Sequence, residues 1–526
     1  MCIRDRLYDS GGHVLGLSAP AVGNLRFAND FAAHSPFRLK ANQMANTSAV
    51  IIGGKGKTII PAVKRYVAIE GFGRLPQFAG GFDKAVDVLS HGWLDSKINE
   101  DGRFRHAVWG DNFKAGPAAD AAVYMDWLAN HCKDADLQKR LRAERDKALS
   151  RLNANDPFSS AVSHVRPPNG PLVFGRVGEF VEMRKRQAIG QLGRFDDKGI
   201  LPYRVGKQDY ARTHFARHAN GYAARTVAGI LEAATLSGDK KLAKQAVELL
   251  DKQTAAYAGT VPRGAQTWEV PLHTPDILAS AYMVKSYVFG YLLTDRQDLL
   301  EQARYWAWTG VPFLYLDNPT DGEVGPYATI AVLGATNWRA PIWFGKPVQW
   351  CGLVYCSALH DLADHDPEGP WRKIAKGITA AGLQMTWPAT DKERQGLLPD
   401  FFFLVEQVSD GPAINPGTVG AHMGELYDAG TMYDLKKLPK RRLFIHAPCT
   451  ISEIREDARE ASLAVDGWGE RTFYVLISGI TKKPAQISVR PLGSPNAPYA
   501  AADVQYHAAG AYAVIKLKGA SQIRLR

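Results

Sequence analysis

The chain has few cysteines and lacks the common nucleotide-binding and metalloprotease signatures. Five cysteines occur in 526 residues, and the four that follow Cys2 are too scattered for a disulfide framework or a zinc site: Cys132, Cys351, Cys356 and Cys449. No GxxxxGK[ST], GxGxxG or HExxH pattern is present, which removes the usual support for nucleotide and zinc-protease chemistry. The sequence therefore predicts that no metal ion and no organic cofactor are needed.

Long apolar runs are also missing. No stretch reaches the roughly 18 uninterrupted apolar residues that a membrane-spanning helix needs, so we expect a soluble protein that does not enter a membrane. Residues 1–6, MCIRDR, look like the translation of an adapter from shotgun library preparation, as in a metagenomic assembly. A secretory signal would have been lost with the true N-terminus. We expect a bacterial periplasmic or secreted protein, and a cytoplasmic location stays open.

The charge balance is modestly basic. The net charge of +11 becomes +10 without residues 1–6, in a chain with the ordinary globular values of 46% hydrophobic and 22% charged residues. Spread over this length, the surplus most often means only a basic pI, although a positive field would also concentrate an anionic glycan. No Lys/Arg tract or nucleic-acid-binding motif is present, so nucleic acid is not expected as a partner.

The middle of the chain alternates two apolar patterns. Residues 218–236 carry almost no charge and indicate a helix buried nearly all round, whereas 239–257 place apolar residues on one face. The pair recurs at 276–293 with 296–309, at 347–364 with 370–385, and more weakly at 117–131 with 134–152. Two concentric rings of helices would bury this pattern. We predict a mainly α fold, an (α/α) barrel or toroid of five to six helical hairpins over residues 81–435; the alternative is an irregular helical domain.

Loop lengths predict that one end of this barrel is elaborated. The turns inside the pairs are short, whereas the connections between pairs are long and cover about 193–217, 258–275, 310–346 and 386–420. Because hairpins alternate in direction, the long connections should all emerge where the inner helices begin. Loops of such length in a compact domain are usually functional.

Short β-rich runs flank the helical region. Between residues 436 and 526 they are separated by Gly, Pro and Asn, which predicts a C-terminal β-sandwich. Residues 7–80 include SAVIIGG, KTIIPAV and RYVAIEGF, which also look strand-like. We interpret them as the remnant of an N-terminal β-domain.

The long loops carry several carboxylates that could catalyse cleavage of a glycosidic bond, a reaction that needs a general acid and a second carboxylate. Glu269 follows Trp268, and a carboxyl beside an indole in a cleft can have a raised pKa. It is the first choice as acid, with an ion pair to Arg263 as the structural alternative. Asp400 and Asp111 are the candidate partners.

Asp276 is a weaker catalytic candidate. Thr274 as N-cap, Pro275 at the first helical position and Asp276 in the first turn form a helix-start signature, which favours a structural role. We expect Glu269, Asp400 and His273 to share one cleft with Trp268 and Trp338. Aromatic residues that could stack on sugar rings are frequent in the same loops: Trp109, Tyr203, Trp268, Tyr327, Trp338, Trp343 and Trp387.

A β-region, an (α/α) barrel and a C-terminal sheet together resemble the six-hairpin glycosidase superfamily. At the residue level the resemblance depends on the segment from Thr267 to Asp276 and on Asn337 with Trp338. It implies a glycoside hydrolase that acts on a poly- or oligosaccharide. Polysaccharide lyases use related toroids, and the alternative reaction is β-elimination on a uronate, with His218, Tyr222, Arg217 and Asn337 as candidate groups.

Weaker sequence features leave two other functions possible, a sugar epimerase and a non-catalytic glycan-binding protein. His218 with His273 or His422 would suit a sugar epimerase, and an aromatic cleft would also suit a non-catalytic glycan-binding protein. Terpene cyclases use similar barrels, but their DxDD and DDxxD motifs are absent.

Overall fold

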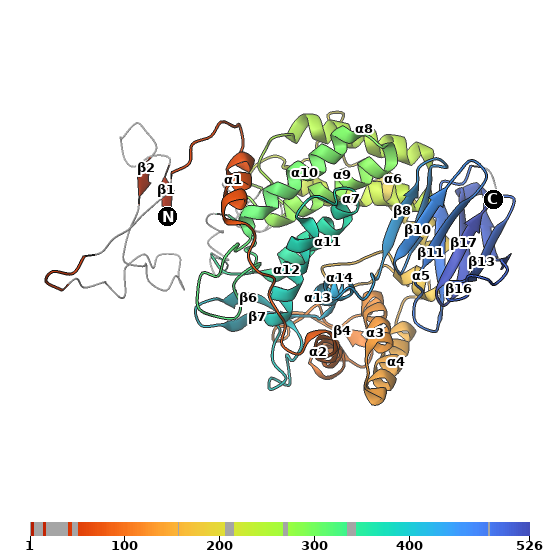
Figure 1. The fold of residues 1–526 in the computed structure, drawn as a ribbon, viewed down its shortest axis with the longest axis horizontal. Coiled ribbons are helices and arrows are strands. Elements are labelled where there is room, and N and C mark those ends of the chain that lie inside the picture. Colours follow the sequence, from red (N-terminus) through yellow and green to blue (C-terminus); the bar gives the residue numbers. More distant parts are fainter. Residues whose placement is uncertain are drawn as a thin grey trace.

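The computed structural model describes residues 2–4, 14–16, 40–44 and 51–526, except for residues 156, 206–214, 267–271, 334–342, 344 and 482–483. Figure 1 shows a helical region in the middle and β-sheets toward the C-terminus. The described part of the chain is mainly helical with several antiparallel sheets, as predicted.

The predicted helix pairs are present. The members buried nearly all round are α3 (Ala119–His131), α7 (Asn220–Ser237), α9 (Ile277–Thr294) and α11 (Gln349–Ala363). Each is followed by a second helix. Three of these bury one face: α4 (Ala135–Ser150), α8 (Lys240–Tyr257) and α10 (Gln297–Gly310). The fourth, α12 (Trp371–Gln384), is buried along most of its length, and only Arg372 and Lys373 are exposed. By length and composition α9 could also cross a membrane. However, 72% of its 18-residue apolar stretch is buried inside the protein, as in a core helix.

Three of the helices buried nearly all round lie side by side. In Figure 1, α7, α9 and α11 are neighbours, and α6 (Val177–Leu192) packs beside α7. One more long helix, α2 (Gly81–Asp95), packs against α3. The short helices are α5 (Gly170–Phe174), α13 (Gly417–Gly420) and α14 (Met423–Leu426). Short 3-10 turns at Val311–Phe313 and Ala508–Gly510 complete the helical elements of the described residues.

The predicted strands just before residue 80 are wrong. KTIIPAV and RYVAIEGF contribute to helix α1 (Ile60–Glu70), which packs against α10. The β-branched residues suggested strands, but Pro61 stands in the first turn, where its missing N–H costs nothing. Val63 and Val67, four residues apart, share the face that packs on the core. Two short strands precede α1: β1 (Cys2–Arg4) and β2 (Val14–Gly16).

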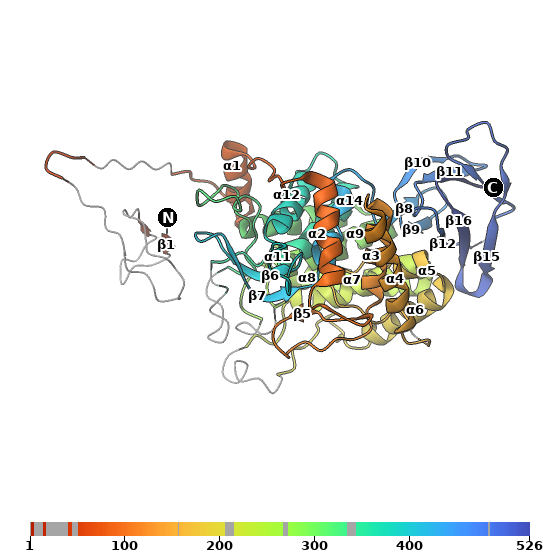
Figure 2. The ribbon, with the colours of Figure 1, turned by 90° about the horizontal axis from the view of Figure 1, so that it is seen from below.

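Two five-stranded antiparallel sheets form the C-terminal part. One has the order β10-β11-β17-β13-β14 and the other β15-β16-β12-β9-β8. Their bounds are β8 Asp434–Leu438, β9 Leu443–Ala447, β10 Ile451–Glu456, β11 Ala461–Val465, β12 Thr472–Ser478, β13 Ile487–Pro491, β14 Ala500–Ala501, β15 Asp503–His507, β16 Tyr512–Lys518 and β17 Ser521–Leu525. The first strand begins two residues before the predicted boundary. Figure 2 shows these sheets on the side of the helical region opposite α1.

A buried ionic cluster joins the helices to these sheets. Asp126 on α3 is 1% exposed and pairs with Arg145 on α4. Its other carboxylate oxygen accepts hydrogen bonds from Trp468 Nε1 at 2.6 Å and from Arg471 at 3.2 Å. A second contact between the helices and these sheets is a close backbone approach, because a Cβ added to Gly238, which ends α7 at φ +61°, would stand 2.0 Å from the backbone nitrogen of Gly479.

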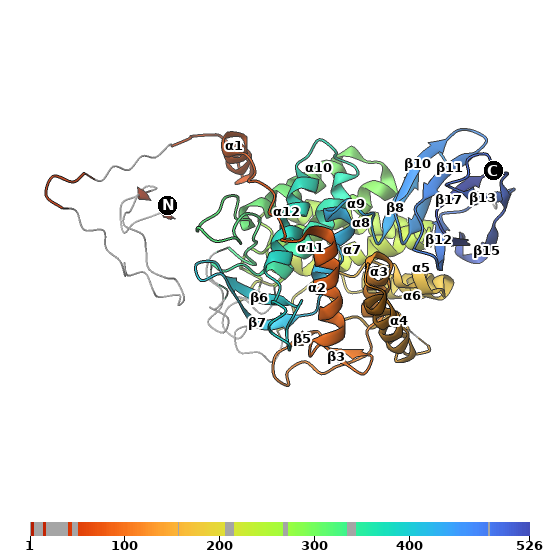
Figure 3. The same ribbon diagram turned by 60° about the horizontal axis from the view of Figure 1, so that its bottom comes forward.

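Small sheets complete the fold at the opposite end of the helices. β5 (Ala107–Val108), β7 (Val408–Ile414) and β6 (Leu398–Phe403) form one antiparallel sheet, seen below α11 and α12 in Figure 3. β3 (Asn99–Glu100) and β4 (Arg103–Phe104) form another.

Candidate active site

Backbone contacts connect the long loops where α9 and α11 begin. Isolated β-bridges pair Arg263 with Pro275, Asp276 with Val332, and Ile330 with Pro347. The bridge between Asp276 and Val332 joins the connection 258–275, where it meets α9, to the connection 310–346. The N–H of Phe402 on β6 then donates to the Pro347 carbonyl at 3.0 Å, which adds the connection that follows α12. These three loops therefore meet at one end of the helical region.

Asp400, on β6 in this group of loops, is held between two indoles. Its Oδ2 accepts a hydrogen bond from Trp343 Nε1 at 2.9 Å, and its Oδ1 accepts one from Trp350 Nε1 at 3.1 Å. Burial raises the pKa of Asp400 to about 6, although the two indole N–H groups act in the opposite direction. The side chain is partly accessible. Below about pH 6, Asp400 is therefore mostly protonated and could donate a proton.

Two histidines extend this group toward the interior. The ring of His164 stacks on Trp350 with centroids 4.0 Å apart, and it meets the ring of His106 edge to face at 4.6 Å. Burial lowers the pKa of both histidines, and that of His164 lies well below its usual range because His106, Arg166 and Arg225 also disfavour a positive charge there. Both rings are neutral near pH 7.

His164 also lines a cavity of about 1190 Å³ that runs along α7, α9 and α11. At this end the cavity is lined by Arg166, Arg225 and Tyr282 as well. The Arg225 guanidinium lies 5.9 Å from the centre of the Tyr282 ring, and burial raises the pKa of the Tyr282 hydroxyl. This mouth of the cavity is positively charged and partly aromatic.

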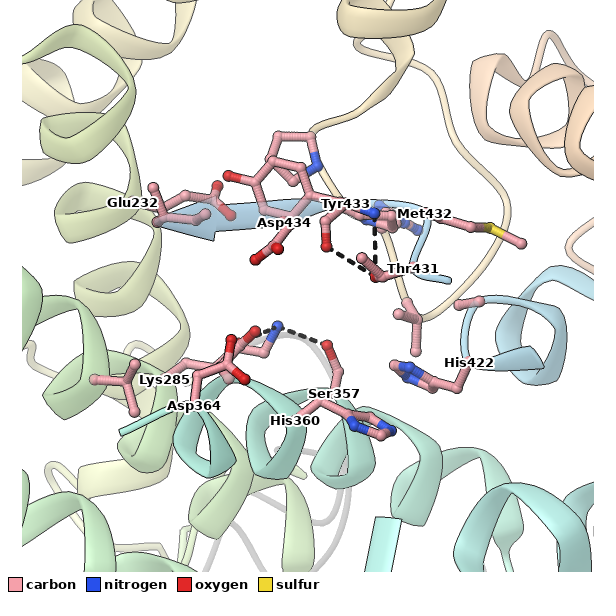
Figure 4. Close-up of a pocket in the computed structure, with 18 of the residues that line it drawn as sticks. Glu232, Lys285, Ser357, His360, Asp364, His422, Thr431, Met432, Tyr433 and Asp434 are labelled. Carbon is pink, nitrogen blue, oxygen red and sulfur yellow. Dashed lines mark hydrogen bonds and ion pairs between the residues drawn. The ribbon is translucent and has the colours of Figure 1, made fainter. Parts of the chain in front are cut away.

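Further into the cavity, charged side chains of both signs pair with groups on neighbouring helices, and Figure 4 shows Glu232 and Lys285 in this region. Arg184 bonds Glu232 at 2.5 Å. Lys285 donates to Ser357 at 2.8 Å and lies 3.5 Å from an oxygen of Asp361. The cavity therefore offers hydrogen-bonding groups along its length, as a hydroxyl-rich ligand needs.

Glu425 and two more histidines lie at this deeper level. Burial raises the pKa of Glu425 to about 7, and one of its oxygens accepts a hydrogen bond from Thr431 at 2.7 Å. Burial lowers the pKa of His360 to about 3 and that of His422 well below its usual range. All three side chains line the cavity, and His422 had been considered only for an epimerase.

Asp276 has a structural position, as its sequence context favours, but the predicted cap is wrong. Asp276 itself, rather than Thr274, is the N-cap of α9, and its Oδ1 accepts from Ala279 N at 2.8 Å. Its Oδ2 accepts from Ala265 N at 2.9 Å, a contact across the loop that no local pattern reveals. The carboxyl is 0% exposed, and burial raises its pKa to about 6.

We predict that Asp276→Ala lowers the free energy of unfolding by about 2–4 kcal/mol, because two buried backbone N–H groups lose their acceptor. Chemical denaturation measures this loss. Asp134→Ala is the matched control, since Asp134 caps only Leu137 N of α4 at an exposed position and should cost about 1 kcal/mol. Equal losses in the two variants would show that Asp276 is an ordinary helix cap.

Arg263 closes the same loop rather than facing a ligand. Its guanidinium donates to the Leu272 carbonyl, and its backbone N–H donates to Asn220 Oδ1 at 2.9 Å. Arg263 and Asp276 therefore fasten the two ends of the segment that contains Trp268 and Glu269.

His218 and Tyr222, two candidate groups for elimination, have different partners in the structure. His218 precedes the helix and its Nδ1 is 2.9 Å from the hydroxyl of Tyr257 on α8, whereas Tyr222 packs edge to face on Tyr203 at 5.4 Å. His218 and Tyr222 do not share a helix face, and none of these side chains lines the large cavity. Arg217 is exposed.

The remaining predicted residues divide into exposed, buried and undescribed groups. Asp111, His273 and Trp109 are exposed, and Trp109 is 48% accessible. Trp343, Tyr327 and Trp387 are buried, which leaves little ring surface for a sugar. Glu269, Trp268, Asn337 and Trp338 lie outside the described residues.

Sequence comparisons provide no family. No protein-family model matches the chain, and no curated protein matches it in sequence. Similar solved structures include an unsaturated glucuronyl hydrolase specific for heparin, at 12% identity and a TM-score of 0.42, covering 66% of this chain and 97% of that one.

Two further solved structures are similar in the same degree. An unsaturated glucuronyl hydrolase from Streptococcus agalactiae has 12% identity and a TM-score of 0.44, with 72% of this chain and 98% of that one covered. A GH76 alpha-mannanase from Bacteroides thetaiotaomicron has 10% identity and a TM-score of 0.38, with 66% and 94% covered. At TM-scores below 0.5 these similarities are too weak to indicate an activity.

Proposed function

We propose that this protein is a carbohydrate-active enzyme that hydrolyses a glycosidic bond in a poly- or oligosaccharide, with Asp400 as the general acid. The observation that supports this most is the carboxyl of Asp400 between two indoles, at the meeting point of the long loops, with its pKa raised to about 6. Such a group can donate a proton to the leaving oxygen near neutral pH.

Glu269 is the proposed second carboxylate. Gln266, three residues before it in the sequence, donates from Nε2 to Cys351 Sγ at 3.2 Å. Cys351 follows Trp350, whose indole bonds Asp400. A separation of about 5–9.5 Å is what paired carboxylates in glycoside hydrolysis need.

An anionic glycan fits the cavity best. Arg166 and Arg225 are exposed to solvent at its mouth, and both lie close enough to disfavour a positive charge on His164. A carboxylate or sulfate on the sugar would be held there by charge-assisted hydrogen bonds. We expect Arg225→Gln to raise KM for a uronate substrate more than it lowers kcat. A matched neutral glycan should show little change.

The raised pKa of Asp400 predicts an alkaline limit to activity. A general acid works in its protonated form, and the protonated fraction of Asp400 falls as the pH rises through about 6. We therefore expect kcat/KM to decline by about tenfold per pH unit above that value. A pH–rate profile measures it. A flat profile between pH 6 and 8 would exclude Asp400 as the acid.

β-Elimination is the second candidate, and one observation favours it. Tyr282, His164, Arg166 and Arg225 line one end of the cavity together, which supplies a base and cations for a uronate. Assays of neutral, uronic and sulfated glycans for both new reducing ends and ultraviolet absorbance distinguish the reactions. Hydrolysis predicts reducing ends without absorbance, lost in Asp400→Asn. An absorbing product that is lost in Tyr282→Phe and retained in Asp400→Asn would establish elimination instead.

A further inference from the structure

Cys356, His360 and His422 bring their ligand atoms together below the mouth of the cavity. Cys356 and His360 are four residues apart on α11 and so share a helix face, and His422 precedes α14. The sulfur and one nitrogen from each ring lie within 4.8 Å of one another. The two rings have centroids 5.4 Å apart, and Figure 4 shows them next to each other.

The histidine nitrogens in this group lack hydrogen-bond partners. Among the described residues, no partner exists for Nδ1 or Nε2 of His360, or for Nε2 of His422, and all three atoms are buried. A buried polar atom without a partner costs about 1–3 kcal/mol. A neutral imidazole has one N–H and one lone pair, so each ring can offer one lone pair to a ligand held between the two rings and Cys356.

A backbone group and a paired cation lie around these side chains. The backbone of Leu353 lies beside the His422 ring and favours a proton on it. With that proton on Nδ1, the lone pair of the unpartnered Nε2 is available for a metal ion. Lys285 also faces the group, but it is paired with Asp361.

We propose that Cys356, His360 and His422 bind a zinc-class transition metal ion. One thiolate and two imidazoles form a borderline-soft set that suits zinc or cobalt and does not suit calcium or magnesium. Zinc bonds of about 2.0–2.3 Å place tetrahedral ligands about 3.5 Å apart, so the side chains would close by about 1 Å on binding. The fourth position faces the cavity, where Glu425 has one oxygen without a partner among the described residues.

This site is distinct from the proposed acid. Ten residues of α11 separate His360 from Trp350, which is about 15 Å along the helix. The inference therefore does not depend on Asp400 or on the proposed reaction. It runs against the sequence-based expectation of no zinc site, which compared the cysteines with one another and left the histidines out.

Cobalt titration of the full chain, after removal of metals with a chelator, tests the proposal. We expect one Co²⁺ per chain, with the visible bands of a four-coordinate ion and a thiolate-to-cobalt charge-transfer band. Cys356→Ser should abolish the charge-transfer band. His422→Ala should weaken binding by more than about 100-fold, beyond the loss caused by removing a group that only supports a ligand.

Cys351→Ser is the matched control, because Cys351 is also a buried thiol on α11. It should leave the titration unchanged. Circular dichroism checks that each variant is folded, and His360→Ala provides a third variant if one of the others is not. The proposal is overturned if the folded protein binds no Co²⁺, or if Cys356→Ser and His422→Ala bind it as the wild type does.

Discussion

Asp400→Asn is expected to lower kcat by about 10²–10⁴-fold, the contribution typical of a general acid. The amide has nearly the same shape but no proton of suitable pKa to give. It also offers only one acceptor to the two indoles that bond Asp400, so the folded state should lose about 1–2 kcal/mol. Steady-state kinetics on a glycan that the wild type cleaves measures the loss of kcat, and a denaturation curve of the same variant measures the loss of stability.

A change of leaving group separates a proton donor from a merely structural residue. On an aryl glycoside whose phenol leaves without protonation, Asp400→Asn should recover most of its activity. Asp410→Asn is the control, because Asp410 lies on the neighbouring strand β7 and bonds only locally, accepting from Gly411 N at 2.7 Å. Equal losses on both kinds of substrate would mean that Asp400 acts through the position of Trp343 or Trp350.

Asp126→Ala should lower the free energy of unfolding by about 3–5 kcal/mol. The substitution leaves Arg145 and Arg471 without their buried counter-charge and Trp468 without an acceptor. Because these partners come from α4 and from the C-terminal sheets, the contact between the two parts of the protein should weaken. Urea denaturation followed by tryptophan fluorescence measures the loss.

Asp146→Ala is the matched control for this cluster. Asp146 pairs with the same Arg145 at 2.7 Å, but its side chain is 64% exposed. A surface ion pair contributes at most about 1 kcal/mol, so this variant should unfold close to the wild type. If the two substitutions lower the free energy of unfolding by the same amount, the buried position of Asp126 does not add to stability in the way we expect.

The helices could be predicted because the pattern of apolar residues within each segment indicates which faces of the helix are buried. The run 218–236 is apolar all round and becomes α7, while 239–257 has one apolar face and becomes α8. The predicted N-cap of α9 was wrong, because Thr274 and Asp276 are both residue types that cap helices and the sequence pattern favoured Thr274. Asp276 is the cap in the structure because its second oxygen also bonds Ala265, a contact that depends on the folded loop.

The site was only partly predictable, because its geometry joins distant segments. Asp400 and Trp343 were both candidates, but Asp400 as the partner of Glu269 and Trp343 as a separate platform for a sugar. Nothing local indicates that the indole of Trp343 donates to Asp400 across 57 residues. One usable signal was missed. The charged exceptions in the apolar helices, Arg225 and Glu232 on α7 and Lys285 on α9, all line the cavity.

Cleavage of an accepted glycan in water labelled with oxygen-18, followed by mass spectrometry of the products, tests the proposed hydrolysis most directly. Hydrolysis by Asp400 and a second carboxylate predicts one labelled oxygen per cleaved bond, no ultraviolet-absorbing product, and loss of both products in Asp400→Asn. Unlabelled products that absorb in the ultraviolet and persist in Asp400→Asn would contradict it.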